Sequence, residues 1–460
     1  MTYLEAVALL HDIESKYDVM SIKYKGVSVW SFLRLRLLDC VSVNTEIKMS
    51  KSVMKIVLKS LFYGSPLQAW KKYDVWAFTA AERRKQVGDK MIHRISGAIV
   101  HVPEKTLMIE KPSRDFGHVA RTSIEEKDII SESWMLFWSQ LFKRLPLVKK
   151  SAIESHQLME KILEDYNIKF DYLHYVRHLD AQRRAMNLTL AIFRKPKTIL
   201  FECPYDSMGY LWAFHQHGLK VIELQHGVLN RNHDAYNARD YDFELNPDSI
   251  CVFGVEEYNY FKRELPKYAK NVEMTGLYML EKADKFFDTD IFTEDRKKYE
   301  HIVVVSGQAG FEEQLGEYIN HVAGKHLEAL FVYIPRHNDV NLNFSHDNIR
   351  FVVGVNIYQY LKWADLHITV SSTTCLEAHY FHTPTLFYDY QKMASSYYGT
   401  VFAPENAVEY LSSEEGFDEA YVRLLNCKFE YREIFAHHHL EKIETVSYTH
   451  LRAHETLSDL

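Results

Sequence analysis

The chain has 460 residues, and at roughly 100 to 200 residues per domain this length predicts two or three domains, of which two is the simplest division. Hydrophobic residues make up 47% of the chain and aromatic residues 14%, which excludes a disordered or fibrous protein. The formal net charge of -7 argues against a general nucleic-acid binder, because neutralising phosphates requires a basic excess, so no nucleic-acid partner is expected.

The cysteines and the N-terminus indicate a cytoplasmic protein. The five cysteines lie far apart and include no CxxC pair, which fits a reducing compartment better than a disulfide framework. The first 18 residues carry acidic side chains without a basic leader, and no stretch reaches the ~20 apolar residues of a spanning helix.

The first 190 residues or so predict a decorated, helix-rich Rossmann-like half. Strands are expected at 74–80 and 106–110, and a strongly helical stretch at 133–168. Residues 48–72 combine six lysines with several apolar residues. A basic amphipathic helix of this kind can lie on the anionic inner face of the plasma membrane, and the alternative is a surface helix packed on its own domain.

From about residue 197 the chain alternates short apolar runs with amphipathic stretches, the pattern of a parallel sheet with crossover helices. Strands at 198–203 and 220–225 complete an N-terminal domain, assigned to 1–240. A second series of strands defines a C-terminal Rossmann-like domain, assigned to 241–445, with strands at 249–254, 301–307, 328–335, 349–354 and 366–371. The run VSYTHLRAHET resembles a translated sequencing adaptor, so 446–460 is expected to be a non-native tail rather than a polar disordered one.

The most specific motif is SSTTCLEAHYFHTP, which follows the predicted strand 366–371. A helix that starts at the carboxyl end of a parallel strand offers free backbone N–H groups to an anion. The four hydroxyl residues at this corner can add donors to phosphate oxygens, and Glu377 can reach ribose hydroxyls; the four are Ser371, Ser372, Thr373 and Thr374. The alternative is a capping box, which needs one hydroxyl residue and a Glu three positions later.

This run resembles the Ser/Thr-rich phosphate motif of GT-B glycosyltransferases that build capsules and lipopolysaccharides. It is similar, more loosely, to the Ser-Gly-Gly corner of UDP-N-acetylglucosamine 2-epimerases. Transferases of this kind often carry a His-Pro pair that contacts the donor nucleotide. Here Arg336 and His337 stand at the end of the strand 328–335, with Asn338 where proline is expected, and the alternative is an ordinary surface pair.

Two further turns follow predicted strands. The small residues of SGQAG, with Gly307 and Gln308, let the backbone approach a ligand closely, although glycine after a strand is usually only a turn. LQHGV resembles the Gln-His-Gly turn of surface-polysaccharide transferases. His226, with a pKa near neutrality, can accept the proton of an attacking hydroxyl or donate to a phosphate, or it is a buried structural histidine; Glu202 is the rival base.

No metal site is expected. The chain has no HExxH or CxxC spacing, no GxSxG elbow and no GxxxxGK[ST] loop. The DTD at 288–290 lies in a charged stretch rather than at a strand end. No cofactor is expected apart from the nucleotide sugar that serves as substrate.

Together these motifs predict an α/β protein of the GT-B type, with two Rossmann-like domains facing a cleft. The resemblance implies a metal-independent glycosyltransferase that moves a sugar from a CMP- or UDP-linked donor to a surface polysaccharide or lipid-linked glycan. The C-terminal domain is expected to hold the donor and the N-terminal domain the acceptor. Three alternatives stay open: a nucleotide-sugar 2-epimerase, a glycerol-phosphate-type transferase, and a non-catalytic assembly subunit.

Overall fold

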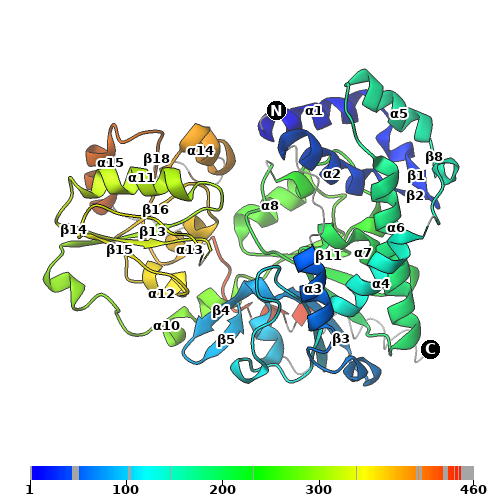
Figure 1. The fold of residues 1–460 in the computed structure, drawn as a ribbon, viewed down its shortest axis with the longest axis horizontal. Coiled ribbons are helices and arrows are strands. Elements are labelled where there is room, and N and C mark those ends of the chain that lie inside the picture. Colours follow the sequence, from blue (N-terminus) through cyan, green and yellow to red (C-terminus); the bar gives the residue numbers. More distant parts are fainter. Residues whose placement is uncertain are drawn as a thin grey trace.

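The chain folds into two α/β halves that lie side by side (Figure 1). The computed structural model describes residues 3–43, 51–101, 105–145, 147–231, 233–337, 339–399, 402, 407–427, 434–439, 441–443 and 445–446. The predicted tail falls outside the described residues from position 447 onward.

The N-terminal half is built on a seven-stranded sheet in which every neighbouring pair is parallel. Its order is β12-β11-β10-β9-β3-β6-β7, with bounds Asn271–Met274, Ser249–Val252, Lys220–Leu224, Thr198–Glu202, Val75–Ala80, Thr106–Lys111 and Ile129–Ser131. The strands predicted at 74–80, 106–110, 198–203 and 220–225 are confirmed. They are apolar along their length because helices cover the sheet, among them α4 (Ser133–Arg144), α6 (Tyr172–Ile192) and α7 (Met208–Gln216).

The second half is a six-stranded parallel sheet of order β15-β14-β13-β16-β17-β18. The strands span Ile349–Phe351, Ala329–Ile334, His301–Ser306, Leu366–Thr369, Thr385–Tyr388 and Val408–Leu411. Its helices are α11 (Glu312–Ala323), α12 (Ile357–Leu361), α13 (Thr374–Tyr380), α14 (Met393–Tyr398) and α15 (Phe417–Leu425). This half therefore has the Rossmann-like pattern that the sequence predicts.

The predicted division at 240/241 is wrong. Strand β11 pairs with β10, and β12 pairs with β11, so the first sheet continues to Met274. The segment between the sheets carries α8 (Val255–Glu264), α9 (Tyr278–Glu281) and α10 (Ala283–Phe286). An apolar run identifies a strand but not its sheet, because both faces of both sheets are buried.

The C-terminal segment also departs from the assigned domain, because it returns to the N-terminal half. The Ala436 amide donates to the Phe253 carbonyl at 2.7 Å, and the ring of Phe435 packs against that of Phe253. His439 Nδ1 lies 2.6 Å from the Thr275 carbonyl oxygen. Residues 434–439 thus pack on the N-terminal half although the sequence places them in the C-terminal domain.

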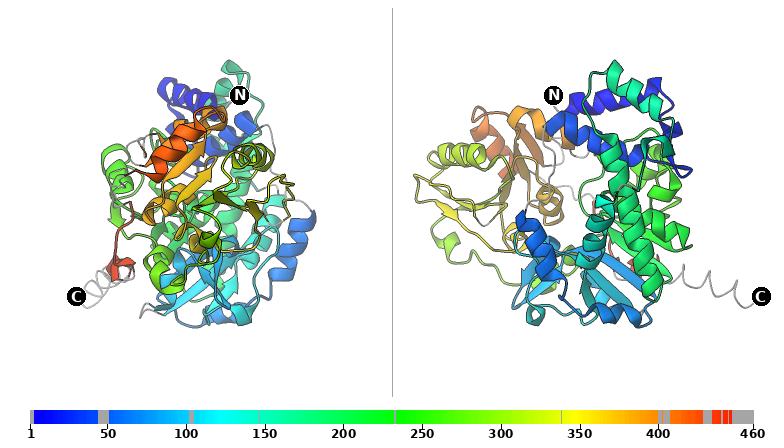
Figure 2. Two further views of the ribbon diagram at one scale, coloured as in Figure 1. Left: turned by 90° about the vertical axis from the view of Figure 1, so that its left-hand side faces the viewer. Right: turned by 45° about the vertical axis from the view of Figure 1, so that its right-hand side comes forward.

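The N-terminal half carries decorations at one end. Helices α1 (Tyr3–Lys16) and α2 (Trp30–Val43) lie beside α5 (His156–Asp165) and the small antiparallel sheet β2-β1-β8, as the dark blue and teal segments show (Figures 1 and 2). That sheet uses Val27–Ser28, Lys23–Tyr24 and Ile153–Glu154. The single helical stretch predicted at 133–168 is therefore two helices with β8 between them.

An antiparallel hairpin, β4 (Arg84–Val87) and β5 (Lys90–His93), reaches from the first half toward the second. Asn356 Nδ2 donates to the Gln86 carbonyl of this hairpin at 3.0 Å. A second contact joins the halves where Asn230 Nδ2 donates to the Tyr397 carbonyl at 2.8 Å. These contacts hold the carboxyl ends of the strands of one sheet opposite those of the other.

Candidate functional site

The hydroxyl-rich turn lies at the carboxyl end of β16 and leads into α13. All four hydroxyl residues are half-buried. Thr374 Oγ1 lies 2.8 Å from Ser306 Oγ at the end of the neighbouring strand β13. Thr373, at the helix N-cap, makes no side-chain cap hydrogen bond, so the capping box of the alternative interpretation does not form. Ser372 Oγ instead accepts from the amide of Thr374, the first residue of α13, at 3.4 Å.

His367 lies beneath this turn and is a residue that sequence reasoning missed. Its Nε2 lies 2.8 Å from Ser306 Oγ, and its Nδ1 lies 3.1 Å from Thr385 Oγ1. Burial lowers its pKa to about 3, so the ring is neutral and fixes the two hydroxyls by hydrogen bonding. A single histidine within an apolar strand carries no sequence signal for this role.

Glu377 is buried and joins the two halves. Its Oε1 accepts from Arg94 Nη1 at 2.9 Å and from the Tyr358 hydroxyl at 3.1 Å. Its Oε2 is buried without a hydrogen bond, and burial raises the pKa of the carboxyl. The Glu377 oxygen that could make the predicted contact with ribose is therefore Oε2, because Oε1 already accepts from two donors.

Glu312 brings two of the predicted segments together. Its Oε1 accepts from the Arg336 amide at 2.8 Å, and its Oε2 accepts from the Tyr333 hydroxyl at 2.7 Å. A Cβ at Gly307 would meet this carboxylate, so a larger residue there would have to displace the Glu312 side chain from these two hydrogen bonds. The side chains of Arg336 and His337 are exposed and that of Gln308 is half-buried, while Asn338 lies outside the described residues.

Glu202 ends β9 on the opposite half, beside Arg83 and His93. Its Oε1 accepts from the Ser96 hydroxyl and lies 3.3 Å from His93 Nδ1, and its Oε2 lies 3.5 Å from Arg83 Nη1. Burial alone would raise the pKa of this carboxyl, but His93 and Arg83 lower it below the ordinary value. Glu202 is therefore ionised at neutral pH, and Oε2 has no hydrogen bond.

His226 follows β10 and faces the same space. Its Nε2 lies 3.1 Å from the Tyr205 hydroxyl, and its Nδ1 is buried without a hydrogen bond. Burial, followed by the charges of Arg83 and His233, holds its pKa well below the ordinary value. The expectation of a pKa near neutrality is thus wrong, because a ring beside cations resists a second proton.

The Gln-His-Gly turn is held by its own glutamine. Gln225 Nε2 donates to the Gly227 carbonyl at 2.7 Å, and Gln225 Oε1 accepts from the Phe253 amide at 2.5 Å. A Cβ built on Gly227 would lie 3.9 Å from the Thr373 methyl carbon. The two turns that the sequence singled out thus face each other across the halves.

Arg94 connects these elements. It donates through Nη2 to the His226 carbonyl at 2.6 Å, in addition to its ion pair with Glu377. Lys85, half-buried on the same hairpin, has its pKa lowered to about 8 by burial and by the charges of Arg94 and Arg336. A concentration of positive charge at facing strand ends favours binding of an anion.

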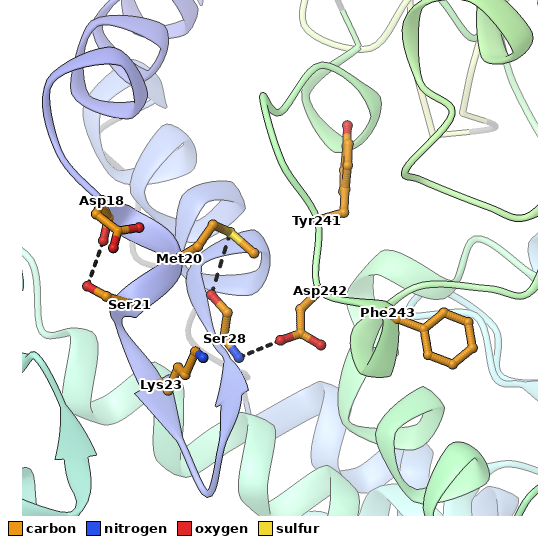
Figure 3. Close-up of a pocket in the computed structure, with 8 residues that line it drawn as sticks. All are labelled: Asp18, Met20, Ser21, Lys23, Ser28, Tyr241, Asp242 and Phe243. Carbon is orange, nitrogen blue, oxygen red and sulfur yellow. Dashed lines mark hydrogen bonds between the residues drawn. The ribbon is translucent and has the colours of Figure 1, made fainter.

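A separate open pocket of about 450 Å³ lies on the N-terminal half, between the β1–β2 hairpin and the loop at 241–243 (Figure 3). The Asp242 carboxylate accepts from the Ser28 amide at 2.7 Å there. None of the predicted site residues lines this pocket. Within the part of the chain that the structure describes, no three His, Cys, Asp or Glu side chains gather so as to hold a metal ion.

No family model matches the chain, and no curated protein matches it. Solved structures do resemble it. MnaA from S. aureus in complex with UDP has 11% sequence identity and a TM-score of 0.52, over 82% of this chain and 97% of that chain.

Two other similar structures are UDP-GlcNAc 2-epimerase from Neisseria meningitidis bound to UDP-GlcNAc and CalG4, the calicheamicin glycosyltransferase. The epimerase has 12% identity and a TM-score of 0.45, over 84% of this chain and 100% of that chain. CalG4 has 12% identity and a TM-score of 0.45, over 85% and 98%. At these identities the likeness shows the fold alone: the chain has a GT-B-like fold of two Rossmann-like halves.

Proposed function

We propose that this protein is a metal-independent glycosyltransferase that transfers a sugar from a nucleotide-activated donor to an acceptor hydroxyl of a surface polysaccharide or lipid-linked glycan. Its donor would lie against the C-terminal half and its acceptor against the N-terminal half. One observation carries the proposal: buried polar atoms without hydrogen bonds converge where the strand ends of the two halves meet. They are Arg94 Nε, His226 Nδ1 and Glu377 Oε2, and beside them Glu202 Oε2 has only its ion pair with Arg83 Nη1 at 3.5 Å.

Such atoms are rare in folded proteins, because each costs roughly 1 to 3 kcal/mol of desolvation without a partner. Three of them at one place, beside a carboxylate oxygen held only by a long ion pair, are accounted for by a polar substrate that supplies the partners. The groups include donors and acceptors, which suits a ligand with both phosphate oxygens and sugar hydroxyls. The positions of these groups then indicate which of them takes the acceptor proton and which contact the leaving phosphate.

In the proposed reaction, the acceptor oxygen loses its proton to a base of the N-terminal half and bonds to the anomeric carbon. The bond between that carbon and the donor phosphate oxygen breaks, and the nucleotide leaves with both electrons. Hydroxyls of Ser372 and Thr373, with Lys85 and Arg94, would stabilise the charge on the leaving phosphate. Glu202 and His226 are the candidates for the base.

We favour Glu202 as the base and His226 as a donor to phosphate. Glu202 is ionised and keeps one oxygen without a hydrogen bond, whereas a second proton on His226 would be repelled by Arg83. If the Tyr205 hydroxyl donates to Nε2, the His226 ring carries its proton on Nδ1, where it can donate to an anion.

A nucleotide-sugar 2-epimerase is the second candidate. Two buried carboxylates, Glu202 and Glu377, keep an oxygen without a hydrogen bond in opposite halves. Epimerisation requires a proton to be removed from one face of a sugar carbon and returned to the other, which two facing acid-base groups can perform.

The purified full-length protein is expected to be stabilised by the nucleotide of its donor. A ligand at 100 times its Kd adds about 2.7 kcal/mol to the free energy of unfolding. Melting temperatures with CMP, UDP, GDP and CDP test this, with adenosine as the uncharged control. No shift with any nucleotide would contradict the proposal. Product analysis with the matching sugar then separates transfer to an acceptor from epimerisation of the donor.

We also propose that the N-terminal half contacts the membrane peripherally through the described part of 48–72. Within α3 (Lys51–Ser60) Val57 is buried, so this helix packs on its own half. Large apolar side chains nevertheless stay exposed beside the lysines: Leu58 at 45%, Phe62 at 79%, Leu67 at 58% and Trp70 at 51%. Such a surface suits the interface of an anionic bilayer. None of the helices among the described residues has both the length and the apolar character needed to cross a membrane.

Replacing Phe62 and Trp70 with Ser is expected to lower binding to phosphatidylglycerol vesicles by at least about tenfold, because burying each apolar side chain contributes about 1.5 to 3 kcal/mol. Co-sedimentation measures the bound fraction, with phosphatidylcholine vesicles as the uncharged comparison. Leu327→Ser, at an exposed apolar side chain of the other half, is the matched control. Equal binding of the double variant and the parent would exclude this surface.

A further inference from the structure

His93 is a buried histidine whose two ring nitrogens face different partners. It is the last residue of β5, and its side chain has 0% exposed surface. Nε2 lies 3.0 Å from the Ala80 carbonyl oxygen at the end of β3. Nδ1 lies 3.3 Å from Oε1 of Glu202, whose side chain is 1% exposed. The hairpin thus places an imidazole ring between a backbone carbonyl and the candidate base.

The contact at Nε2 fixes one proton of the ring. A carbonyl oxygen can only accept a hydrogen bond, so Nε2 carries a proton and donates to Ala80. A neutral imidazole has a single N–H, and with that proton on Nε2 the Nδ1 atom would present a lone pair to the Glu202 carboxylate. Two electron-rich atoms 3.3 Å apart repel each other strongly in a buried place, because little water screens them. A second proton, on Nδ1, turns this repulsion into an ion pair.

The Glu202 carboxyl has the partners of an ionised group. Its Oε1 also accepts from the Ser96 hydroxyl, and its Oε2 lies 3.5 Å from Arg83 Nη1. Burial raises the pKa of the Glu202 carboxyl, but His93 and Arg83 lower it below its ordinary value. The proton between the two side chains therefore belongs on Nδ1 of the ring and not on the carboxylate.

The remaining charged and titratable groups around this pair are joined to one another. They are Arg84, Arg94, Glu110, His118, Glu126 and Glu377. Arg84 lies opposite His93 in the hairpin, and two carboxylates balance its charge. Glu110 favours a positive charge on the ring, whereas Arg94 opposes it but is itself paired at 2.9 Å. At 3.3 Å, Glu202 is the carboxylate that contacts the ring.

We propose that His93 is a positioning residue for the candidate base: it is doubly protonated in the resting protein, and its ion pair keeps the buried Glu202 carboxylate ionised and ready to take the acceptor proton. This inference rests on the proposed function, in which Glu202 is the base. The O–H bond of the acceptor breaks and an O–H bond forms at Oε2, while His93, on the Oε1 side, keeps both of its protons. The same positive charge favours release of that proton after transfer, which restores the base.

The protonation of His93 can be measured without any substrate. In the full-length protein with isotope-labelled histidine, nitrogen NMR separates protonated from unprotonated ring nitrogens, and the signals lost in His93→Gln identify this residue among the 24 histidines. At neutral pH both nitrogens of His93 are expected to carry a proton. In Glu202→Gln only Nε2 should carry one, because a neutral amide does not stabilise the cation and can itself donate to Nδ1. A singly protonated ring in the parent, or an unchanged ring in Glu202→Gln, would overturn the inference.

The second measurement is the pH dependence of kcat/KM for transfer, which reports the ionisation of the base in the free protein. Loss of the imidazolium raises the pKa of Glu202, so less of the base is ionised on the acid side. The acid limb of the profile of His93→Gln is therefore expected to move to higher pH by at least about one pH unit. A purely structural role of His93 would lower kcat/KM at every pH and leave the acid limb in place, and that result would overturn the inference.

His118→Gln is the matched control. His118 Nδ1 lies 2.7 Å from Oε1 of another buried carboxylate, Glu110, so the same kind of contact is removed away from the candidate base. This variant should keep the acid limb of the parent, and an equal movement of the limb in both variants would contradict a specific role of His93. If the parent transfers no sugar at any pH, the proposed function fails, whereas the NMR measurement still decides the charge of His93.

Discussion

Glu202→Gln is expected to lower transferase turnover by about 10² to 10⁴ while nucleotide affinity stays nearly intact, because this is the usual contribution of a general base. The amide keeps the shape of the side chain but has no negative charge to take a proton. His226→Ala is expected to lower turnover less and to weaken nucleotide binding more, because the ring would donate to phosphate. The measurement is turnover at saturating donor for both variants, with nucleotide affinity and melting temperature.

Glu126→Gln is the matched control for Glu202→Gln. Glu126 is also buried, and its carboxylate pairs with Arg84 at 3.0 Å, but it lies away from the facing turns. A general loss of stability would affect both variants, whereas loss of the base affects Glu202→Gln alone. If His226→Ala proves the more damaging change in a folded protein that still binds donor, His226 is the base. Near-normal turnover in both variants would remove both residues from the mechanism.

The double change Ser372→Ala and Thr373→Ala is expected to weaken nucleotide binding strongly without altering the fold. Each hydrogen bond to a charged phosphate is worth about 1.5 to 3 kcal/mol, so each lost hydroxyl should cost roughly 10- to 150-fold in affinity. The fold should survive, because Ser306 and His367 hold the Thr374 hydroxyl, and the change removes only the 3.4 Å hydrogen bond from the Thr374 amide to Ser372 Oγ. Titration calorimetry with the nucleotide identified in the thermal screen measures the effect.

Ser412→Ala is the control for that double change, since Ser412 is an exposed serine of the same half, distant in sequence from the turn. It should bind nucleotide like the parent. Unchanged affinity in the double variant would show that the hydroxyl-rich turn is not a phosphate site, and the helix would then have a structural role only.

Much of the fold follows from local patterns. Parallel strands buried on both faces appear as continuous apolar runs, so β3, β6, β9, β10, β13, β14 and β16 could be predicted from sequence. The same property concealed the division between the halves, because β11 is as apolar as β13 although it belongs to the other sheet. The sheet to which a strand belongs is set by the strands that pair with it, and these are distant in sequence.

The sequence by itself determined the α/β class, the hydroxyl-rich turn and the Gln-His-Gly turn, because each depends on residues that are close together in the chain. Only the tertiary structure decided which residues lie opposite these two turns. Arg94 lies 132 residues before His226 and 283 before Glu377, yet it bonds to both. The low pKa of His226 likewise depends on burial and on Arg83, which no local pattern reveals. The charge of a side chain and its hydrogen-bond partners depend on the groups packed around it. These groups come together only when strand ends that are distant in sequence meet in the folded protein.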